Sequence, residues 1–173
     1  NKEWAWGYRE TDALGGKDPY SASKAMAELT IRSYLNSILN VSKKNVQLAI
    51  ARAGNVIGGG DWAEDRIVPD CVKAWAQLKK VIIRNPFATR PWQHVLEPLS
   101  GYLTLASNLY HSSQNNGEPF NFGPSKKNSI TVKELINMFI KKNQNINFAN
   151  YKGVNKLKET KLLSLNCIKA ENR

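Results

Sequence analysis

The sequence predicts an α/β fold, and three observations support this prediction. Short apolar runs that suit buried strands alternate with longer stretches in which apolar residues have helical spacing. Of the 173 residues, 42% are hydrophobic and 23% are charged, which is typical of a globular protein. No apolar run approaches the roughly 20 residues that a membrane-spanning helix needs, so no such helix is expected.

A loop, a helix and a strand are predicted for the first part of the chain. Residues 1–18 are rich in tryptophan, glycine and polar residues, and we expect them to form a loop. Apolar spacing predicts an amphipathic helix from Ser21 to about Leu39, with Asp18 and Pro19 at positions typical of a helix start. Residues 46–51 then predict a buried strand, which leads into a glycine-rich loop at 54–61.

The rest of the chain continues the alternation. We expect a helix over about 66–78, a strand at 81–84, a helix over about 96–110, a strand at 120–122 and a helix over 131–142. Thr131 precedes the last of these helices, and Glu134 stands three residues further on. This spacing predicts a capping box, in which each side chain bonds the backbone of the other residue.

The net charge of +11 is unevenly distributed. Residues 1–125 contain 14 Lys/Arg against 11 Asp/Glu, whereas residues 126–173 contain 11 against 3. A basic segment of this kind raises the hypothesis of a nucleic-acid-binding module. No nucleic-acid motif accompanies it and aromatic residues are sparse there, so lysines along a solvated helix face are the simpler interpretation.

Cysteine and histidine are too few for an evident metal site or disulfide framework. The chain has only Cys71, Cys167, His94 and His111, without Cys-x-x-Cys or His-x-x-x-His spacing. We therefore expect no metal, and two reduced thiols in a cytoplasmic protein.

Tyr20 and Lys24 are the first candidates for chemistry. They are four residues apart, so a helix places them on one face, one turn from each other. A nearby ammonium favours the phenolate and lowers the pKa of a tyrosine from about 10 toward neutrality. The pair is thus a candidate proton-transfer device.

Several segments, in a fixed order, carry a resemblance to known enzymes. Tyr20-x-x-x-Lys24 and the strand ending in Arg52-Ala53-Gly54-Asn55 resemble the extended short-chain dehydrogenase/reductase family. Within that family, the chain most resembles the CDP-glucose 4,6-dehydratases. This closer resemblance rests on residues 4–10, 51–62, 83–86 with 90–99, and 121–124, and it recurs more weakly near 162–165.

The resemblance implies the C-terminal part of an NAD-binding Rossmann fold with a smaller nucleotide-sugar-binding domain. Residues 1–57 would belong to the Rossmann domain and 58–173 mainly to the substrate domain, with about 92–122 returning to the Rossmann domain. The family's phosphate-binding loop and its Ser/Thr-Asp-Lys trio would precede residue 1. We therefore expect a fragment that is inactive alone and does not fold stably by itself, from a protein that forms a homodimer.

The resemblance also implies residue roles. Tyr20 would remove the proton from the sugar C4 hydroxyl, and Lys24 would hold the nicotinamide ribose and lower the tyrosine pKa. Small residues at Ala53 and Gly54 would let the backbone approach the nicotinamide. The implied substrate-binding residues are Asn55 (sugar and pyrophosphate), Arg66 and Arg90 (phosphate), and Arg84 (near the nucleobase).

The implied function is NAD-dependent dehydration of CDP-glucose to CDP-4-keto-6-deoxyglucose, in cytoplasmic synthesis of the sugars of lipopolysaccharide O-antigen. One alternative is a nucleotide-sugar epimerase, or a 4,6-dehydratase for a dTDP or UDP sugar. The nucleic-acid-binding module is a remote alternative. Neither a membrane nor a nucleic acid is expected as a partner.

Overall fold

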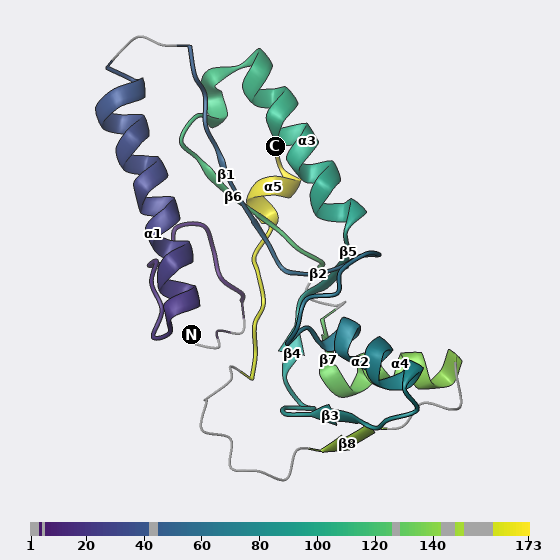
Figure 1. Cartoon of the computed structure of the whole chain (residues 1–173). Coiled ribbons are helices and arrows are strands. Elements are labelled where there is room, and N and C mark those ends of the chain that lie inside the picture. The colour runs from purple at the N-terminus through teal and green to yellow at the C-terminus, as the bar shows by residue number, and fades with distance from the viewer. Residues whose placement is uncertain (1–3, 5, 42–44, 126–128, 143–147, 151–160) are drawn as a thin grey trace.

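The computed structural model describes residues 4, 6–41, 45–125, 129–142, 148–150 and 161–173. Its elements form two groups joined by a strand pair (Figure 1). The first lobe contains α1 (Pro19–Tyr34), β1 (Ile50–Ala53), α3 (Leu96–His111), β6 (Pro119–Phe122) and α5 (Ile168–Glu171). The second lobe contains α2 (Ile67–Ala76), β3 (Val81–Ile83), β4 (Thr89–Arg90), β7 (Ile130–Thr131), α4 (Val132–Lys142) and β8 (Phe148–Asn150). The joining pair is β2 (Asn55–Ile57) with β5 (Trp92–His94).

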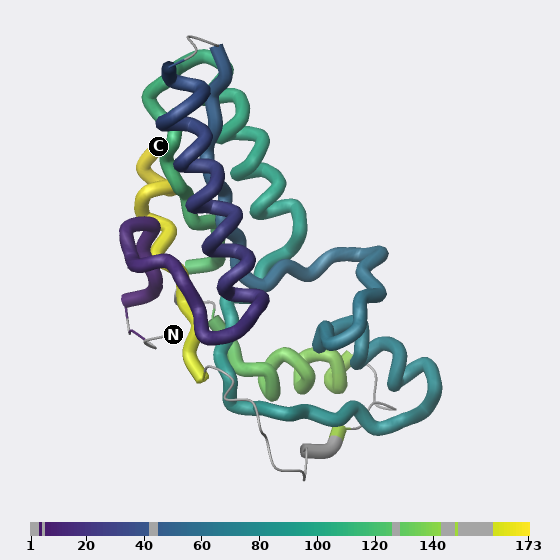
Figure 2. Tube along the Cα trace, turned by 60° about the vertical axis from the view of Figure 1, so that its left-hand side comes forward, coloured from purple at the N-terminus to yellow at the C-terminus, as the bar shows by residue number. Residues whose placement is uncertain are grey.

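Two parallel strands form the centre of the first lobe. Ile50 in β1 lies opposite Pro119 in β6, and Ala53 lies opposite Phe122. Helices α1 and α3 flank this pair, as the views in Figures 1 and 2 both show. Parallel strands connected through helices are the arrangement that the predicted α/β class requires.

The second lobe has an apolar core. Cys71 from α2, Val81 and Ile83 from β3, and Ile136 from α4 are buried against one another. Strand β3 pairs in parallel with β8, and β4 pairs with β7 in antiparallel fashion. Removal of these side chains from water provides the main force that holds the helices against the strands.

Helix α1 begins and ends close to the predicted positions. The Asp18 side chain caps its first turn by accepting a 2.9 Å bond from the Ser21 amide, and Pro19 occupies the first turn. After Tyr34 the helix continues as a π-helical turn, η1 (Leu35–Leu39). The predicted capping box of α4 is also confirmed, because the Glu134 amide donates to the Thr131 hydroxyl at 3.1 Å and the Thr131 amide donates to the Glu134 carboxylate at 2.7 Å.

The strand predicted over 46–51 begins only at Ile50. Before it, the Leu48 amide donates to the Asn116 side chain at 2.9 Å, and the Leu48 carbonyl accepts from the Gly117 amide at 2.6 Å. These groups therefore bond to a turn, where Gly117 has φ of +82°, and not to a neighbouring strand. A short 3₁₀ turn, η2 (Ser113–Asn115), precedes this turn.

The segment before α1 is bonded to the end of the chain. The Tyr8 amide donates to the Ser164 carbonyl at 2.8 Å, and the Asn166 amide donates to the Tyr8 carbonyl at 2.9 Å. The Asn121 side chain, buried in β6, donates to the carbonyls of Tyr8 at 2.9 Å and Asn166 at 3.1 Å. The predicted loop is therefore held against the first lobe.

Among the helices in the described ranges, none combines the length and the apolar character needed to cross a membrane.

Shortening a side chain in the core of the second lobe is expected to destabilise that lobe. Ile136 is fully buried, so Ile136→Ala in the whole protein should lower the free energy of unfolding by about 2–5 kcal/mol. Met138→Ala, on the exposed side of the same helix, should change it by less than about 1 kcal/mol. Chemical denaturation followed by fluorescence measures both variants, and equal effects would contradict the assignment of the core.

Candidate functional site

Tyr20 and Lys24 come together in the first two turns of α1. The Lys24 ammonium nitrogen lies 5.9 Å from the centre of the Tyr20 ring, and the tyrosine is 64% exposed. Both views place the start of α1 at the end of the first lobe toward which β1 and β6 run (Figures 1 and 2). This is the edge at which parallel α/β sheets bind their ligands.

The start of α1 is fixed by hydrogen bonds to its cap. The Ser21 hydroxyl donates to the Asp18 carboxylate at 2.7 Å, and the Ser21 amide donates to the other carboxylate oxygen at 2.9 Å. These bonds lower the pKa of Asp18 below its usual range, because they stabilise the ionised carboxylate. The cap therefore stays charged at neutral pH, two residues before Tyr20.

Ala53, Gly54 and Asn55 form the passage from β1 to β2. The Gly54 amide donates to the Phe122 carbonyl at 3.0 Å, and the Asn55 amide donates to the Pro91 carbonyl at 3.0 Å. A Cβ on Gly54 would lie 2.7 Å from that Pro91 oxygen. Packing against Pro91 therefore already requires a glycine here, independently of the predicted approach to a cofactor.

Arg66 and Arg84 are exposed and lie near one another through Asp65. Arg66 precedes the first residue of α2, and its side chain makes no capping bond there. The Arg84 guanidinium is 3.5 Å from the carboxylate of Asp65, which adjoins Arg66 in sequence. An exposed ion pair at this distance contributes little to stability.

Arg90 lies closer to the joining strand pair. It is half-buried at the end of β4, and its guanidinium donates to the Thr89 carbonyl at 3.0 Å. Trp92, two residues on, lies opposite Asn55 in the parallel pair of β2 and β5. Arg90 and Asn55 thus flank the same stretch of backbone.

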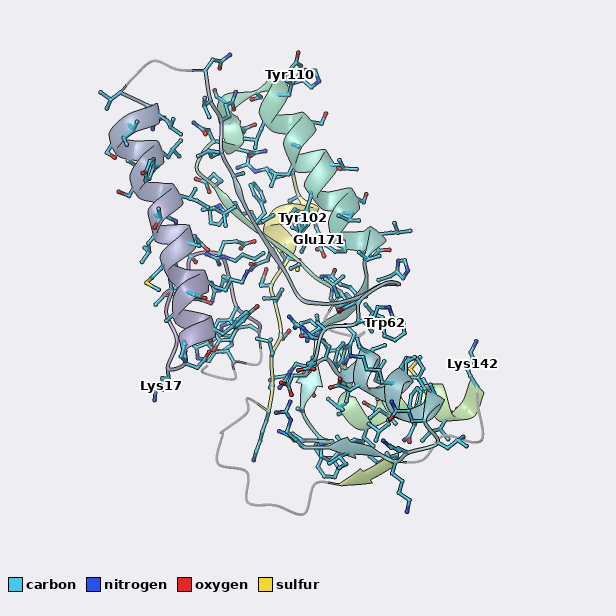
Figure 3. All side chains as sticks on the ribbon, in the orientation of Figure 1. Lys17, Trp62, Tyr102, Tyr110, Lys142 and Glu171 are labelled. Atoms are coloured by element: carbon cyan, nitrogen blue, oxygen red, sulfur yellow. The ribbon has the colours of Figure 1, made fainter. Side chains whose placement is uncertain are left out.

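The predicted residues therefore form three groups. Tyr20 with Lys24 stands at the start of α1, Ala53 to Asn55 with Arg90 stands at the joining strand pair, and Arg66 with Arg84 stands in the second lobe. Figure 3 shows how the side chains extend from both lobes, with Lys17 just before α1 and Trp62 beside the second lobe. Trp62 is 60% exposed, so it is not core packing within the described chain.

The sequence analysis assigned no site role to His94, Cys71 or Cys167. The His94 Nδ1 accepts a bond from the Leu96 amide at 3.3 Å, where α3 begins. Cys71 and Cys167 are free and buried. Burial raises the pKa of Cys71 to about 12 and that of Cys167 to about 11, which keeps both as unreactive thiols. Within the described ranges, no cluster of three His, Cys, Asp or Glu could hold a metal ion.

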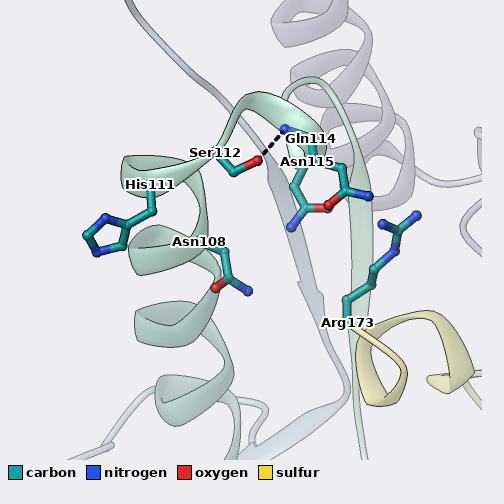
Figure 4. Close-up of a pocket in the computed structure, with 6 residues that line it drawn as sticks. All are labelled: Asn108, His111, Ser112, Gln114, Asn115 and Arg173. Carbon is teal, nitrogen blue, oxygen red and sulfur yellow. Dashed lines mark hydrogen bonds between the residues drawn. The ribbon is translucent and has the colours of Figure 1, made fainter.

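A cavity of about 180 Å³ lies away from these residues (Figure 4). It stands beside the last turn of α3, and the Gln114 amide donates to the Ser112 hydroxyl there at 3.2 Å. Its lining residues are Asn108, His111, Ser112, Gln114, Asn115 and Arg173. None of the sequence-predicted site residues contributes to it, so we place the candidate site at the carboxyl ends of β1 and β6.

The sequence analysis did not identify the buried polar contacts behind the site. Glu28, one turn after Lys24, is 6% exposed and bonds both Arg32 and Arg52. Gln93 is 7% exposed, and its side chain donates to the Phe122 carbonyl at 3.0 Å. In the sequence, only the four-residue spacing of Lys24, Glu28 and Arg32 indicated a contact of this set, namely the one between Glu28 and Arg32 within the helix.

Comparison with known proteins gives one curated relative of clear similarity. The chain is 49% identical over 143 residues to the CDP-glucose 4,6-dehydratase of Salmonella typhimurium (strain LT2). The match includes 81% of this chain, and the chain spans 40% of the length of that relative. The resemblance stated from the sequence is thereby confirmed. A search of protein-family models found none that matches.

Solved structures share the fold at lower identity. A dTDP-glucose 4,6-dehydratase from Bacillus anthracis in complex with NAD is 20% identical, with a TM-score of 0.69 over 96% of this chain and 49% of its own. The corresponding enzyme from Streptomyces venezuelae, with NAD bound, is 19% identical, with a TM-score of 0.74 over 96% of this chain and 48% of its own. An epimerase from Methanothermobacter thermautotrophicus is 18% identical, with a TM-score of 0.81 over 99% of this chain and 49% of its own. These likenesses confirm the predicted α/β, Rossmann-type fold, of which this chain spans about half.

A side chain at position 54 is expected to disturb the junction between the lobes. Gly54→Ala would place a methyl group 2.7 Å from the Pro91 oxygen and should lower the free energy of unfolding of the whole protein by about 1–3 kcal/mol. Gly59→Ala, whose added methyl group meets nothing within 4 Å, should change it by less than about 1 kcal/mol. Thermal denaturation distinguishes the two. A neutral Gly54→Ala would show that the Pro91 contact does not require glycine.

Proposed function

We propose that the whole protein is an NAD-dependent CDP-glucose 4,6-dehydratase, a lyase that converts CDP-glucose to CDP-4-keto-6-deoxyglucose. The observation that carries the proposal is the 49% identity to a CDP-glucose 4,6-dehydratase over 81% of this chain. The exposed Tyr20–Lys24 pair at the carboxyl end of the parallel strands supports it.

In this proposal Tyr20 removes the proton from the sugar C4 hydroxyl. Within the described chain, the Lys24 ammonium makes no salt bridge to a carboxylate, and its ring contact is with Tyr20. It is thus available both to stabilise a developing phenolate and to bond a ribose hydroxyl. Both side chains project from the helix into solvent, and both would face a bound ligand.

The described residues fit NAD at this edge. Ala53 ends β1 with a small, exposed side chain, and Lys24 offers ammonium donors to a ribose. When bound, NAD supplies a hydride acceptor that returns the hydride later in the reaction. The residues of this chain would hold the ribose, orient the sugar hydroxyl and move its proton.

Asn55, Arg66, Arg84 and Arg90 are proposed to bind the nucleotide sugar. A pyrophosphate suits the paired donors of Arg66 and Arg90. Arg84, whose guanidinium lies 3.5 Å from the Asp65 carboxylate, is proposed to lie near the nucleobase. We propose the domain division 1–57 and about 92–122 for the Rossmann domain, with 58–173 otherwise mainly in the substrate domain; the segment that ends in α5 packs with the first lobe and is the exception.

We also propose that the whole protein is a homodimer that pairs through α1. The charged residues of this helix, Lys24, Glu28 and Arg32, recur at four-residue spacing along one face. The side of the helix away from this face exposes Met26 and Leu29 and carries no charge. An uncharged, exposed helix surface of this kind supports an interface between subunits. A cytoplasmic location and a role in O-antigen sugar synthesis complete the proposal.

A nucleotide-sugar epimerase is the second candidate. It is favoured by one specific observation, namely that the epimerase structure has a higher TM-score, 0.81, than the two dehydratases described above. A dehydratase for a dTDP or UDP sugar is the related alternative. Dehydration and epimerisation differ in product mass, so a single assay separates them.

The substrate assay uses the whole protein with NAD and, separately, CDP-glucose, dTDP-glucose and UDP-glucose. We expect loss of one water from CDP-glucose, detected by mass spectrometry, and little from the other two. Loss of water from another nucleotide sugar alone would correct the nucleotide. A change of sugar configuration without loss of water would replace the dehydratase by an epimerase.

Tyr20→Phe is expected to lower kcat of the whole enzyme by at least about 100-fold, because the variant has no hydroxyl to accept the proton. The dissociation constant for the nucleotide sugar, measured by calorimetry, should change by less than about threefold. Tyr34→Phe is the matched control, since it removes an exposed hydroxyl from the same helix, and it should leave kcat unchanged. Normal turnover by Tyr20→Phe would contradict the assigned base.

A further inference from the structure

The position of α1 depends on a buried charge. Within the described chain, Glu28 is the buried residue of this helix, and its carboxylate faces β1. The Arg52 Nε donates to one Glu28 oxygen at 2.9 Å, and an Arg52 terminal nitrogen donates to the other. Two parallel bonds between a guanidinium and a carboxylate fix orientation as well as distance.

Arg52 is the partner that links Glu28 to another element. Arg32 also donates to the Glu28 carboxylate, at 2.9 Å, but it lies on the same helix and cannot locate that helix on the strands. Arg52 extends the link further, because its terminal nitrogen is 3.4 Å from the Glu10 carbonyl. The Glu10 carboxylate in turn accepts from the Asn121 amide of β6 at 2.8 Å.

This contact links the two elements that carry Tyr20 with Lys24 and the backbone leading to Asn55. Glu28 follows Lys24 by one helical turn and Tyr20 by two, which is about 6 Å and about 12 Å along the axis. Arg52 precedes Asn55 by three residues in the strand direction. A shift of α1 on β1 would therefore move Tyr20 and Lys24 relative to the backbone that leads into Asn55.

We propose that Arg52 is a positioning residue, which sets the Tyr20–Lys24 helix against β1 through its paired bonds to Glu28. The inference rests on the proposed dehydratase function for its kinetic consequence. Its structural consequence does not depend on that function. Arg52→Lys keeps the positive charge but cannot make the two parallel bonds. This variant therefore separates the effect of the charge from the effect of the bond geometry.

The test compares Arg52→Lys with Arg32→Lys in the whole enzyme. Misplacement of reacting groups by about 1 Å lowers rates by up to about 100-fold, so kcat of Arg52→Lys should fall about 10- to 100-fold. The dissociation constant for CDP-glucose should change by less than about threefold. Arg32→Lys, which affects only the contact within the helix, should lower kcat by less than about twofold.

Two further readouts separate positioning from loss of folded protein. With CDP-glucose carrying deuterium at sugar C4, the isotope effect on kcat should rise in Arg52→Lys, because transfer at C4 becomes slower. A smaller folded fraction would lower the rate without changing this isotope effect. Hydrogen exchange of the α1 amides should become faster in Arg52→Lys and stay unchanged in Arg32→Lys.

Equal kcat, isotope effect and exchange in Arg52→Lys and the wild type would overturn the inference. If Arg52→Lys does not fold, Glu28→Gln, which keeps the side-chain shape but removes the charge, is measured in the same way. If the wild type converts none of the nucleotide sugars, the proposed function fails. The exchange of α1 then still decides whether Arg52 positions this helix.

Discussion

The carbonyl oxygen of Phe122 accepts two hydrogen bonds, and the arrangement of both lobes depends on them. The Gly54 amide donates to it at 3.0 Å from the end of β1, and the Gln93 side chain donates at 3.0 Å from β5. The first bond ends the β1–β6 pair, and the second holds the β2–β5 pair against it. Because Phe122 is the last residue of β6, one carbonyl group fixes where the chain leaves the first lobe.

Close backbone contact accompanies this junction. The Pro91 carbonyl accepts the Asn55 amide at 3.0 Å, in a space that a Cβ on Gly54 would partly occupy. On the other side, a Cβ on Gly101 of α3 would lie 2.4 Å from the Phe122 ring. Glycine at these two positions lets α3 approach Phe122 of β6 and lets the backbone at position 54 approach Pro91. The course of the backbone into Asn55 depends on this close approach.

Different forces stabilise the interior of each lobe. In the second lobe, apolar side chains of α2, β3 and α4 exclude water, and shape complementarity decides the packing. In the first lobe, a buried glutamate of α1 bonds Arg52 of β1. Buried ion pairs are directional, since a displaced partner leaves an uncompensated charge. Such a directional contact would hold the proposed Tyr20–Lys24 pair in a fixed position relative to β1.

Much of the fold followed from the sequence, because its main elements are long and periodic. Helices α1 and α3 and the Thr131–Glu134 capping box were predicted from apolar spacing and cap residues. The strands β2, β4, β5, β7 and β8 were missed, since two or three residues have no periodicity to detect, and β2 lies where a glycine-rich loop was predicted. The equally short β3 was predicted because its residues form a continuous apolar run. The Arg52–Glu28 contact was also missed, because residues 24 apart meet only through the tertiary fold. Candidate site residues could be selected by motif, but their division among three places could not.

If these residues bind the ligand as proposed, their division constrains what that ligand can be. Tyr20 and Lys24 belong to the first lobe, whereas Arg66 and Arg84 belong to the second, and Asn55 lies on the strand pair between them. A small monosaccharide would contact only one of these groups. A nucleotide sugar has its nucleobase, its pyrophosphate and its sugar in series. Its phosphates can therefore contact arginines while its sugar hydroxyl reaches the proposed catalytic base, Tyr20. Dehydratases and epimerases both appear among the structural neighbours, so the fold alone does not distinguish their chemistry.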